Sequence, residues 1–209
     1  MLIFNSLRLN QVYLIRGAKV GKFSMPIFLY YQIISIFVPM FQIEDFIVDV
    51  VYGERLLISK LADPSELDEN IRVARVLLGC FDDMNIRINE HLLVFGHKNP
   101  EYTINEKLGD RKGVESENGI KSAFRKAKEQ GCQTVVLDFD MHMADNILKT
   151  KKIASGIYGR HEDFISGIIN ECYIVHNNNA VVVKSDVFAA SDKDTAKRQI
   201  EDEIEKLRT

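Results

Sequence analysis

Two carboxylates and a lysine stand close together in the stretch 99–112. Glu101 follows an asparagine-proline step at the start of a short apolar run, and Asp110 and Lys112 are separated by one residue after a turn. Alternate side chains of a strand share a face, so a turn over 105–107 can return Glu101 to the face of the other two. Two acids beside a lysine can hold a divalent metal ion and a polarised water, which phosphodiester hydrolysis requires. The same spacing is also compatible with two surface acids and a surface lysine.

The elements that must position these residues begin with a helix ahead of the stretch. Asp63 is the expected N-cap, Pro64 the first helical residue and Glu66 the acid of a capping box. The apolar positions that follow recur at helical spacing: Leu67, Ile71, Ala74, Leu78 and Phe81. Two β-rich runs within 46–59 predict a hairpin before the helix, and residues 85–95 predict one bent strand after it.

A second helix is predicted after the stretch, with Gly131 as its stop signal. Four apolar positions form its expected buried stripe: Ile120, Ala123, Phe124 and Ala127. A separate ridge of three cations could bind substrate phosphates or be only the solvated face of the helix: Lys121, Arg125 and Lys128. The nearly continuous apolar run 133–139 then predicts an interior strand covered on both faces.

The C-terminal part alternates helical and extended patterns. Helices are expected within 143–155 and 161–170, followed by a hairpin over 173–183 whose three consecutive asparagines tolerate positive φ. The tail 192–208 predicts a charged helix with a thin apolar stripe. We therefore expect an α/β (α+β) fold, a mixed central sheet of αβββαβ order flanked by helices, with an N-terminal apolar arm and this C-terminal charged helix.

Composition excludes some classes of protein. The chain has 209 residues with 46% hydrophobic residues, which is enough for a buried core. Its net charge of -3 gives no global basic field, so any contact with nucleic acid must be a local patch. The three cysteines, Cys80, Cys132 and Cys172, are far apart and odd in number, and we interpret them as reduced core thiols without a zinc site.

Residues 1–43 differ from the rest of the chain. Arg16, Lys19 and Lys22 precede the segment 24–43, which has no charged residue and approaches the ~20 residues needed to cross a bilayer. Prolines and glutamines dilute this segment and no small-residue cleavage site follows it. Three interpretations stay open: an extension upstream of the functional start, a packed apolar arm, or a membrane contact through 24–43.

The order of the elements carries a resemblance to a known family. The αβββαβ order is that of the core of PD-(D/E)xK nucleases. The region Ile47–Phe188 resembles the C-terminal tRNA nuclease domains of contact-dependent growth inhibition (CdiA-type) toxins and their relatives in bacterial mobile elements. The segments that carry the resemblance are short, and their order gives it specificity: Glu69–Ala74, Asn99–Glu101, Ile104–Asn105, Asp110–Lys112, Ile120–Ala127 and Val135–Asp138.

The resemblance implies a metal-dependent ribonuclease that acts on tRNA in the cytoplasm, with Mg²⁺ as cofactor and a cognate immunity protein as partner. Glu101 and Asp110 would be the metal ligands and Lys112 the catalytic lysine, with the helix cations 121, 125 and 128 on the substrate. Family members carry aspartate at the first position and glutamate at the second, so both carboxylates are exchanged here. The implied organisation is an extension over 1–43, a nuclease-like domain over 44–190 and the C-terminal helix over 191–209.

Two alternatives follow from the same residues. The exchanged acids and the slightly acidic charge are compatible with a non-catalytic RNA- or protein-binding module on the same fold. The toxin class also includes metal-independent ribonucleases of the barnase- and RelE-like (BECR) fold, which use basic and histidine side chains. His97, Arg160 and His161 would be the candidates for that chemistry.

Overall fold

The computed structural model describes residues 3–4, 11–16, 19–24, 46–94, 96–114, 118–140, 149–189 and 192–208. The chain divides into two compact units, residues 1–45 and 46–209. In the first unit three strands form an antiparallel sheet: β1 (Ile3–Phe4), β2 (Gln11–Arg16) and β3 (Lys19–Ser24). Beyond Ser24, the predicted apolar segment 24–43 lies outside the described residues, so its three interpretations stay predictions. Within the described ranges, every helix is too short or too polar to span a bilayer.

The second unit is built on one mixed eight-stranded sheet, in the order β11-β10-β9-β8-β7-β6-β5-β4. Its strands are β4 (Phe46–Asp49), β5 (Gly53–Ser59), β6 (Ile86–Ile88), β7 (Tyr102–Ile104), β8 (Lys107–Gly113), β9 (Thr134–Asp138), β10 (Glu171–His176) and β11 (Asn179–Lys184). The pairs β5–β6, β8–β9 and β9–β10 are parallel and the other neighbours are antiparallel. The predicted α/β class is confirmed.

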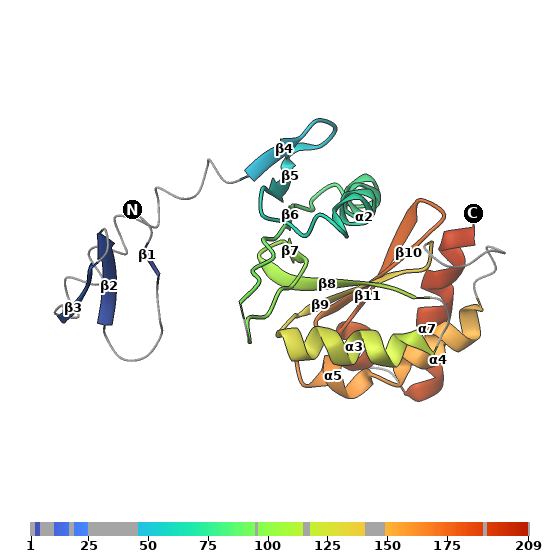
Figure 1. The fold of residues 1–209 in the computed structure, drawn as a ribbon. Coiled ribbons are helices and arrows are strands. Elements are labelled where there is room, and N and C mark those ends of the chain that lie inside the picture. Colours follow the sequence, from blue (N-terminus) through green and yellow to red (C-terminus); the bar gives the residue numbers. More distant parts are fainter. Residues whose placement is uncertain are drawn as a thin grey trace. The chain divides into compact units, whose positions relative to one another are not determined.

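Helices cover both faces of this sheet (Figure 1). They are α2 (Leu67–Cys80), α3 (Gly119–Gln130), α4 (Thr150–Tyr158), α5 (His161–Ile165), α6 (Asp186–Ala189) and α7 (Lys193–Glu205), which continues into a 3₁₀ turn at Lys206–Arg208. α2 packs over β5, β6, β10 and β11, whereas α3, α4 and α7 pack together on the other face. From α2 to β9 the elements follow the predicted αβββαβ order.

Strand β9 shows how the sheet separates two apolar cores. Val135 and Leu137 pack in the core beneath α3, and Val136 packs in the core beneath α2. All residues of β9 are buried, which confirms the interior strand expected from the run 133–139. Because alternate side chains of each strand reach opposite cores, the chemistry of one face can be assigned from strand register alone.

Two hairpins have the turns that their sequences predict. Asn105 and Glu106 have positive φ (45° and 66°) between β7 and β8, and Asn177 and Asn178 have positive φ (51° and 56°) between β10 and β11. Positive φ at both central residues is the geometry of a two-residue turn that matches strand twist. Gly131, at φ 77°, ends α3 as expected, and the next amide returns to the Ala127 carbonyl at 2.9 Å.

Three local predictions are wrong. α2 begins at Leu67, and Asp63 accepts hydrogen bonds from Ser65 in a preceding turn, so the capping box does not form. Residues 92–94 are not a strand, because this segment leaves the sheet and returns at β7. Cys80 is exposed, at the end of α2, whereas the other two cysteines are buried as expected.

The remaining helices match their patterns in part. The pattern 143–155 lies outside the described residues up to 148, and α4 begins at Thr150. α5 is shorter than predicted because Gly167, at φ 71°, turns the chain soon after it. The apolar stripe of α7 is buried as expected: Ala196, Ile200 and Ile204, continued by Leu207 of the 3₁₀ turn. α7 packs against α4 and β11 within the second unit.

Candidate active site

Strand register brings the two predicted acids together. Tyr102 pairs with Gly109 across the β7–β8 hairpin, so the next position in this register sets Glu101 opposite Asp110. The parallel pairing of β8 with β9 places Asp110 and Lys112 on the α3 face of the sheet. The hairpin therefore gathers all three predicted residues at one point, on one face.

The lysine bridges the two carboxylates. Lys112 Nζ lies 3.1 Å from Glu101 Oε1 and 3.0 Å from Asp110 Oδ1. Glu101 Oε2 accepts a hydrogen bond of 2.6 Å from the backbone N–H of Arg111. Asp110 is completely buried, and its Oδ2 has no hydrogen-bond partner among the described residues. A buried carboxylate oxygen without a donor is costly, and a bound cation or water would satisfy it.

A third acid, Glu66, joins the site and was missed from the sequence. Its Oε2 lies 3.5 Å from Arg111 Nη2, and it lines the same cavity as Glu101 and Lys112. Burial is the main cause that raises the pKa of Glu66, and the negative charge of Glu101 raises it further. The sequence pattern predicted Glu66 as the acid of a capping box. Its place in the site could have been indicated only by the position of an acid at the start of the helix that precedes the stretch 99–112.

A cavity of about 420 Å³ opens above these groups, between the start of α2, the segment linking β6 to β7, and α3. Gln130, the last residue of α3, lines it, and the buried Oε1 of this side chain has no partner in the described part of the chain. Asp110 does not line the cavity itself, but its Oδ1 lies 3.0 Å from Nζ of Lys112, which does. One buried oxygen without a donor thus belongs to the lining and another lies directly behind it, which is typical of a site that binds a ligand.

The electrostatics of the site favour a shared proton or cation. Burial and, after it, the negative charge of Asp110 raise the pKa of Glu101, Lys112 opposes them, and the net value is about 7. Burial alone would lower the pKa of Lys112, but the two carboxylates outweigh burial and the net direction is upward. Lys112 is therefore charged at neutral pH, while Glu101 exchanges its proton near neutrality.

The raised pKa of Glu101 makes stability depend on pH. A carboxyl group whose pKa rises from 4.5 to about 7 on folding contributes stability below pH 4.5 and loses it as pH rises through 7. We expect the free energy of unfolding to fall by roughly 3 kcal/mol over this window. Denaturant titrations at a series of pH values measure this slope. Glu101→Gln should flatten it, and an unchanged slope in that variant would contradict the assignment.

The predicted cationic ridge lies beside the site. Arg125 pairs with Glu129 at 2.7 Å, and Lys128 pairs with Asp163 at 2.7 Å. Lys121 is exposed on α3. None of the three ridge cations lines the cavity, whereas Lys126 of the same helix does. The structure thus gathers the acids and Lys112 but directs the ridge elsewhere.

The residues of the metal-independent alternative are distributed over two places. His97 lines the cavity with Lys112. Arg160 and His161 lie at the start of α5, where the His161 ring stacks on Tyr158 with centroids 5.1 Å apart. Neither of these two lines the cavity that holds His97.

Behind the site, a buried ionic network joins β8 to α2. Arg111 Nε donates to Asn70 Oδ1 at 2.6 Å, and Arg111 Nη1 lies 3.2 Å from Asp138 Oδ2. Arg72 Nη2 reaches the same Asp138 oxygen at 2.5 Å, and the Tyr102 hydroxyl donates to the Asn70 carbonyl at 2.8 Å. This network fixes the start of α2 against the strands that carry the acids.

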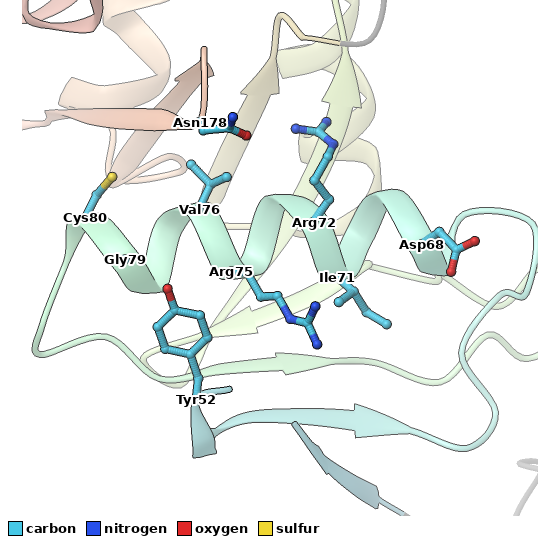
Figure 2. Close-up of a pocket in the computed structure, with 9 residues that line it drawn as sticks. All are labelled: Tyr52, Asp68, Ile71, Arg72, Arg75, Val76, Gly79, Cys80 and Asn178. Atoms are coloured by element: carbon cyan, nitrogen blue, oxygen red, sulfur yellow. The ribbon is translucent and has the colours of Figure 1, made fainter. Parts of the chain in front are cut away.

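A larger cavity of about 670 Å³ lies on the outer side of α2. Figure 2 shows Arg72 and Asn178 on one side of the helix, and Arg75 and Tyr52 on the other. Arg75 pairs with Asp49 at 2.6 Å, and Arg72 pairs with acids in the network described above. Both arginines of this cavity are therefore neutralised, and none of the predicted catalytic residues lines it. The smaller cavity remains the better candidate for chemistry.

Comparison of the chain with protein-family models, with curated proteins and with solved structures finds no match in any of the three. The site is therefore judged on its own geometry.

Proposed function

We propose that the chain is a metal-dependent ribonuclease of the bacterial toxin type, with tRNA as its substrate. The observation that supports this most is the buried pair of acids, Glu101 and Asp110, bridged by Lys112 in a cavity, with Asp110 Oδ2 lacking a donor among the described residues. A site of two carboxylates and a lysine on adjacent strands suits hydrolysis of a phosphodiester.

The donor set fits Mg²⁺. In the described ranges no three His, Cys, Asp or Glu side chains converge to hold a metal ion by themselves. Mg²⁺ is usually held by one or two carboxylates, several waters and the substrate phosphate, so a third protein ligand is not required. Asp110 and Glu101 would supply the carboxylate oxygens. When bound, the ion would polarise a phosphoryl oxygen and lower the pKa of a coordinated water.

Each residue of the site has a role that its surroundings allow. Asp110 is held rigidly in a paired strand, which fixes its carboxylate. Glu101 is oriented by the Arg111 amide, so its second oxygen can turn to Lys112 or to a ligand. Lys112, charged and 21% exposed at its side chain, can donate to the phosphate oxygens as negative charge accumulates on them.

The exchanged carboxylates are accommodated by the hairpin. The longer Glu101 approaches from outside β7, and the shorter Asp110 projects directly from β8, yet both oxygens lie at nearly equal distances from Lys112 Nζ, 3.1 Å and 3.0 Å. The exchange therefore keeps one cation centred between two acids. This geometry supports activity despite the departure from the family pattern.

Removal of divalent metal is the direct test. Purified protein should cleave total tRNA with Mg²⁺ present, and EDTA should abolish the cleavage because the carboxylates alone cannot activate water. Gel analysis of end-labelled tRNA measures both rates, and readdition of Mg²⁺ should restore the first. EDTA-resistant cleavage that is lost in His97→Ala or His161→Ala would replace this proposal with the metal-independent chemistry.

A non-catalytic binding module is the second candidate. Lys112 already neutralises both acids, and a purely structural ion triad would have the same contacts. That function predicts association with RNA or protein and no turnover at any concentration of Mg²⁺.

Under the nuclease proposal, the cytoplasm is the site of action because tRNA is there, and a cognate immunity protein would protect the producing cell.

A further inference from the structure

The cavity is lined by two mostly buried groups, Glu101 and Lys112, and by exposed lysines, while Asp110 lies behind Lys112 outside the lining. Asp110 has no exposed surface, and the side chains of Glu101 and Lys112 are 15% and 21% exposed. Lys98 and Lys126 line the same cavity and are exposed. If one phosphate of an RNA strand bound beside Glu101 and Lys112, the neighbouring phosphates of the same RNA strand would lie near these exposed lysines.

Most other charged groups around the mouth are already paired. His91 Nδ1 lies 3.4 Å from Asp63 Oδ2, and Glu129 Oε1 lies 2.7 Å from Arg125 Nη1. The lysines 98 and 126 form no ion pair with any residue that the structure describes. Lys98 and Lys126 are therefore cations without a counter-ion among the described residues, on a cavity that the acids Asp63, Glu66 and Glu101 also line.

The backbone around Lys98 is held in place. The Asn99 side chain accepts from the Leu92 amide at 3.0 Å and donates to the Leu92 carbonyl at 3.2 Å, which closes the loop. Asn89 Nδ2 donates to the Pro100 carbonyl at 2.9 Å. In Figure 1 this segment, between β6 and β7, lies beside the C-terminal end of α3, where Lys126 is placed. Lys98 thus starts from the held segment between β6 and β7, and Lys126 starts from helix α3.

We propose that Lys98 and Lys126 bind the phosphates that flank the scissile phosphate of an RNA strand. This inference rests on the proposed function and replaces the ridge as the main substrate contact. Lysines in such positions supply affinity that depends on salt and not on base sequence. Arg125 and Lys128 are engaged by acids, so they are less available for phosphates.

Binding of a fluorescein-labelled single-stranded RNA, measured by anisotropy in EDTA over a salt series, tests the inference without cleavage. The full chain with Lys98→Ala and Lys126→Ala should bind roughly tenfold or more weakly. Its plot of log affinity against log salt should be shallower by about 1.4, because each phosphate contact on a single strand contributes about 0.7.

Two variants with matched charge complete the design. Lys151→Ala with Lys193→Ala removes two exposed helix lysines that do not line the cavity and should leave binding and slope unchanged. Lys121→Ala with Arg125→Ala tests the ridge. If the ridge variant loses affinity and the mouth variant does not, the inference is overturned even though the wild type cleaves tRNA. If the mouth variant loses affinity and the wild type never cleaves, the inference stands and the nuclease proposal fails.

Discussion

Asp110→Asn is expected to lower the rate of tRNA cleavage by at least about 100-fold, the scale on which loss of one preorganised electrostatic group lowers a catalysed rate. The asparagine keeps the shape of the side chain but removes the charge that Lys112 and a metal ion require. Neutralising the fully buried Asp110 relieves its repulsion with Glu101 but removes one partner of Lys112, which keeps Glu101 as its counter-ion at 3.1 Å, so the variant should still fold. Single-turnover cleavage with excess Mg²⁺, together with denaturant unfolding of both proteins, measures the two effects.

Asp49→Asn is the matched control for this variant. Asp49 is also buried and also pairs with a cation, Arg75, at 2.6 Å, but it does not line the cavity of Glu101 and Lys112. Its replacement should change stability and leave cleavage within about threefold of the wild-type rate. Equal rates for Asp110→Asn and the wild type would exclude Asp110 from the chemistry. Equal losses in the two variants would indicate a general effect of removing buried charge.

Arg111→Met is expected to destabilise the fold by about 3–5 kcal/mol, because it removes one partner of a buried ionic network. The guanidinium is 4% exposed and contacts Asn70, Asp138 and Glu66. Methionine fills much of the space but leaves the Asn70 amide oxygen and part of the Asp138 carboxylate without their donor. The free energy of unfolding from denaturant titration measures the loss.

Arg125→Met gives the comparison for an exposed arginine. Its side chain is 58% exposed and pairs with Glu129 one helical turn away, an arrangement that usually contributes less than about 1 kcal/mol. If Arg111→Met and Arg125→Met destabilise the protein equally, the buried network does not carry the stability assigned to it.

Strand and helix patterns predicted much of this fold because they are local. The asparagines at 105 and 177–178 specified tight turns, and the turn at 105–106 delivered Glu101 to Asp110 as the alternation of strand residues requires. The stripe of α3 was recognisable from spacing alone, and all four of its members are buried. These features need no knowledge of distant partners.

The parts that the sequence did not predict depend on distant partners. Glu66 has the spacing of a capping residue, yet Arg111, far along the chain, draws it into the site. Helical periodicity indicated that Lys121, Arg125 and Lys128 leave the core, but not that Lys126 of the same helix would line the cavity in their place. That choice depends on where the segment between β6 and β7 packs, and no local pattern specifies it.

The alternation of side chains along β8 has a consequence for how the protein becomes competent. Arg111 sends its guanidinium to α2 on one face, while its own amide orients Glu101 among the acids on the other. Strand pairing sets the register of the acids, and we expect the docking of α2 onto the Arg111 side chain to hold β8 in the position from which its amide orients Glu101. Under the nuclease proposal, a chain in which α2 has not docked would be inert, so activity and complete folding would arise in the same step.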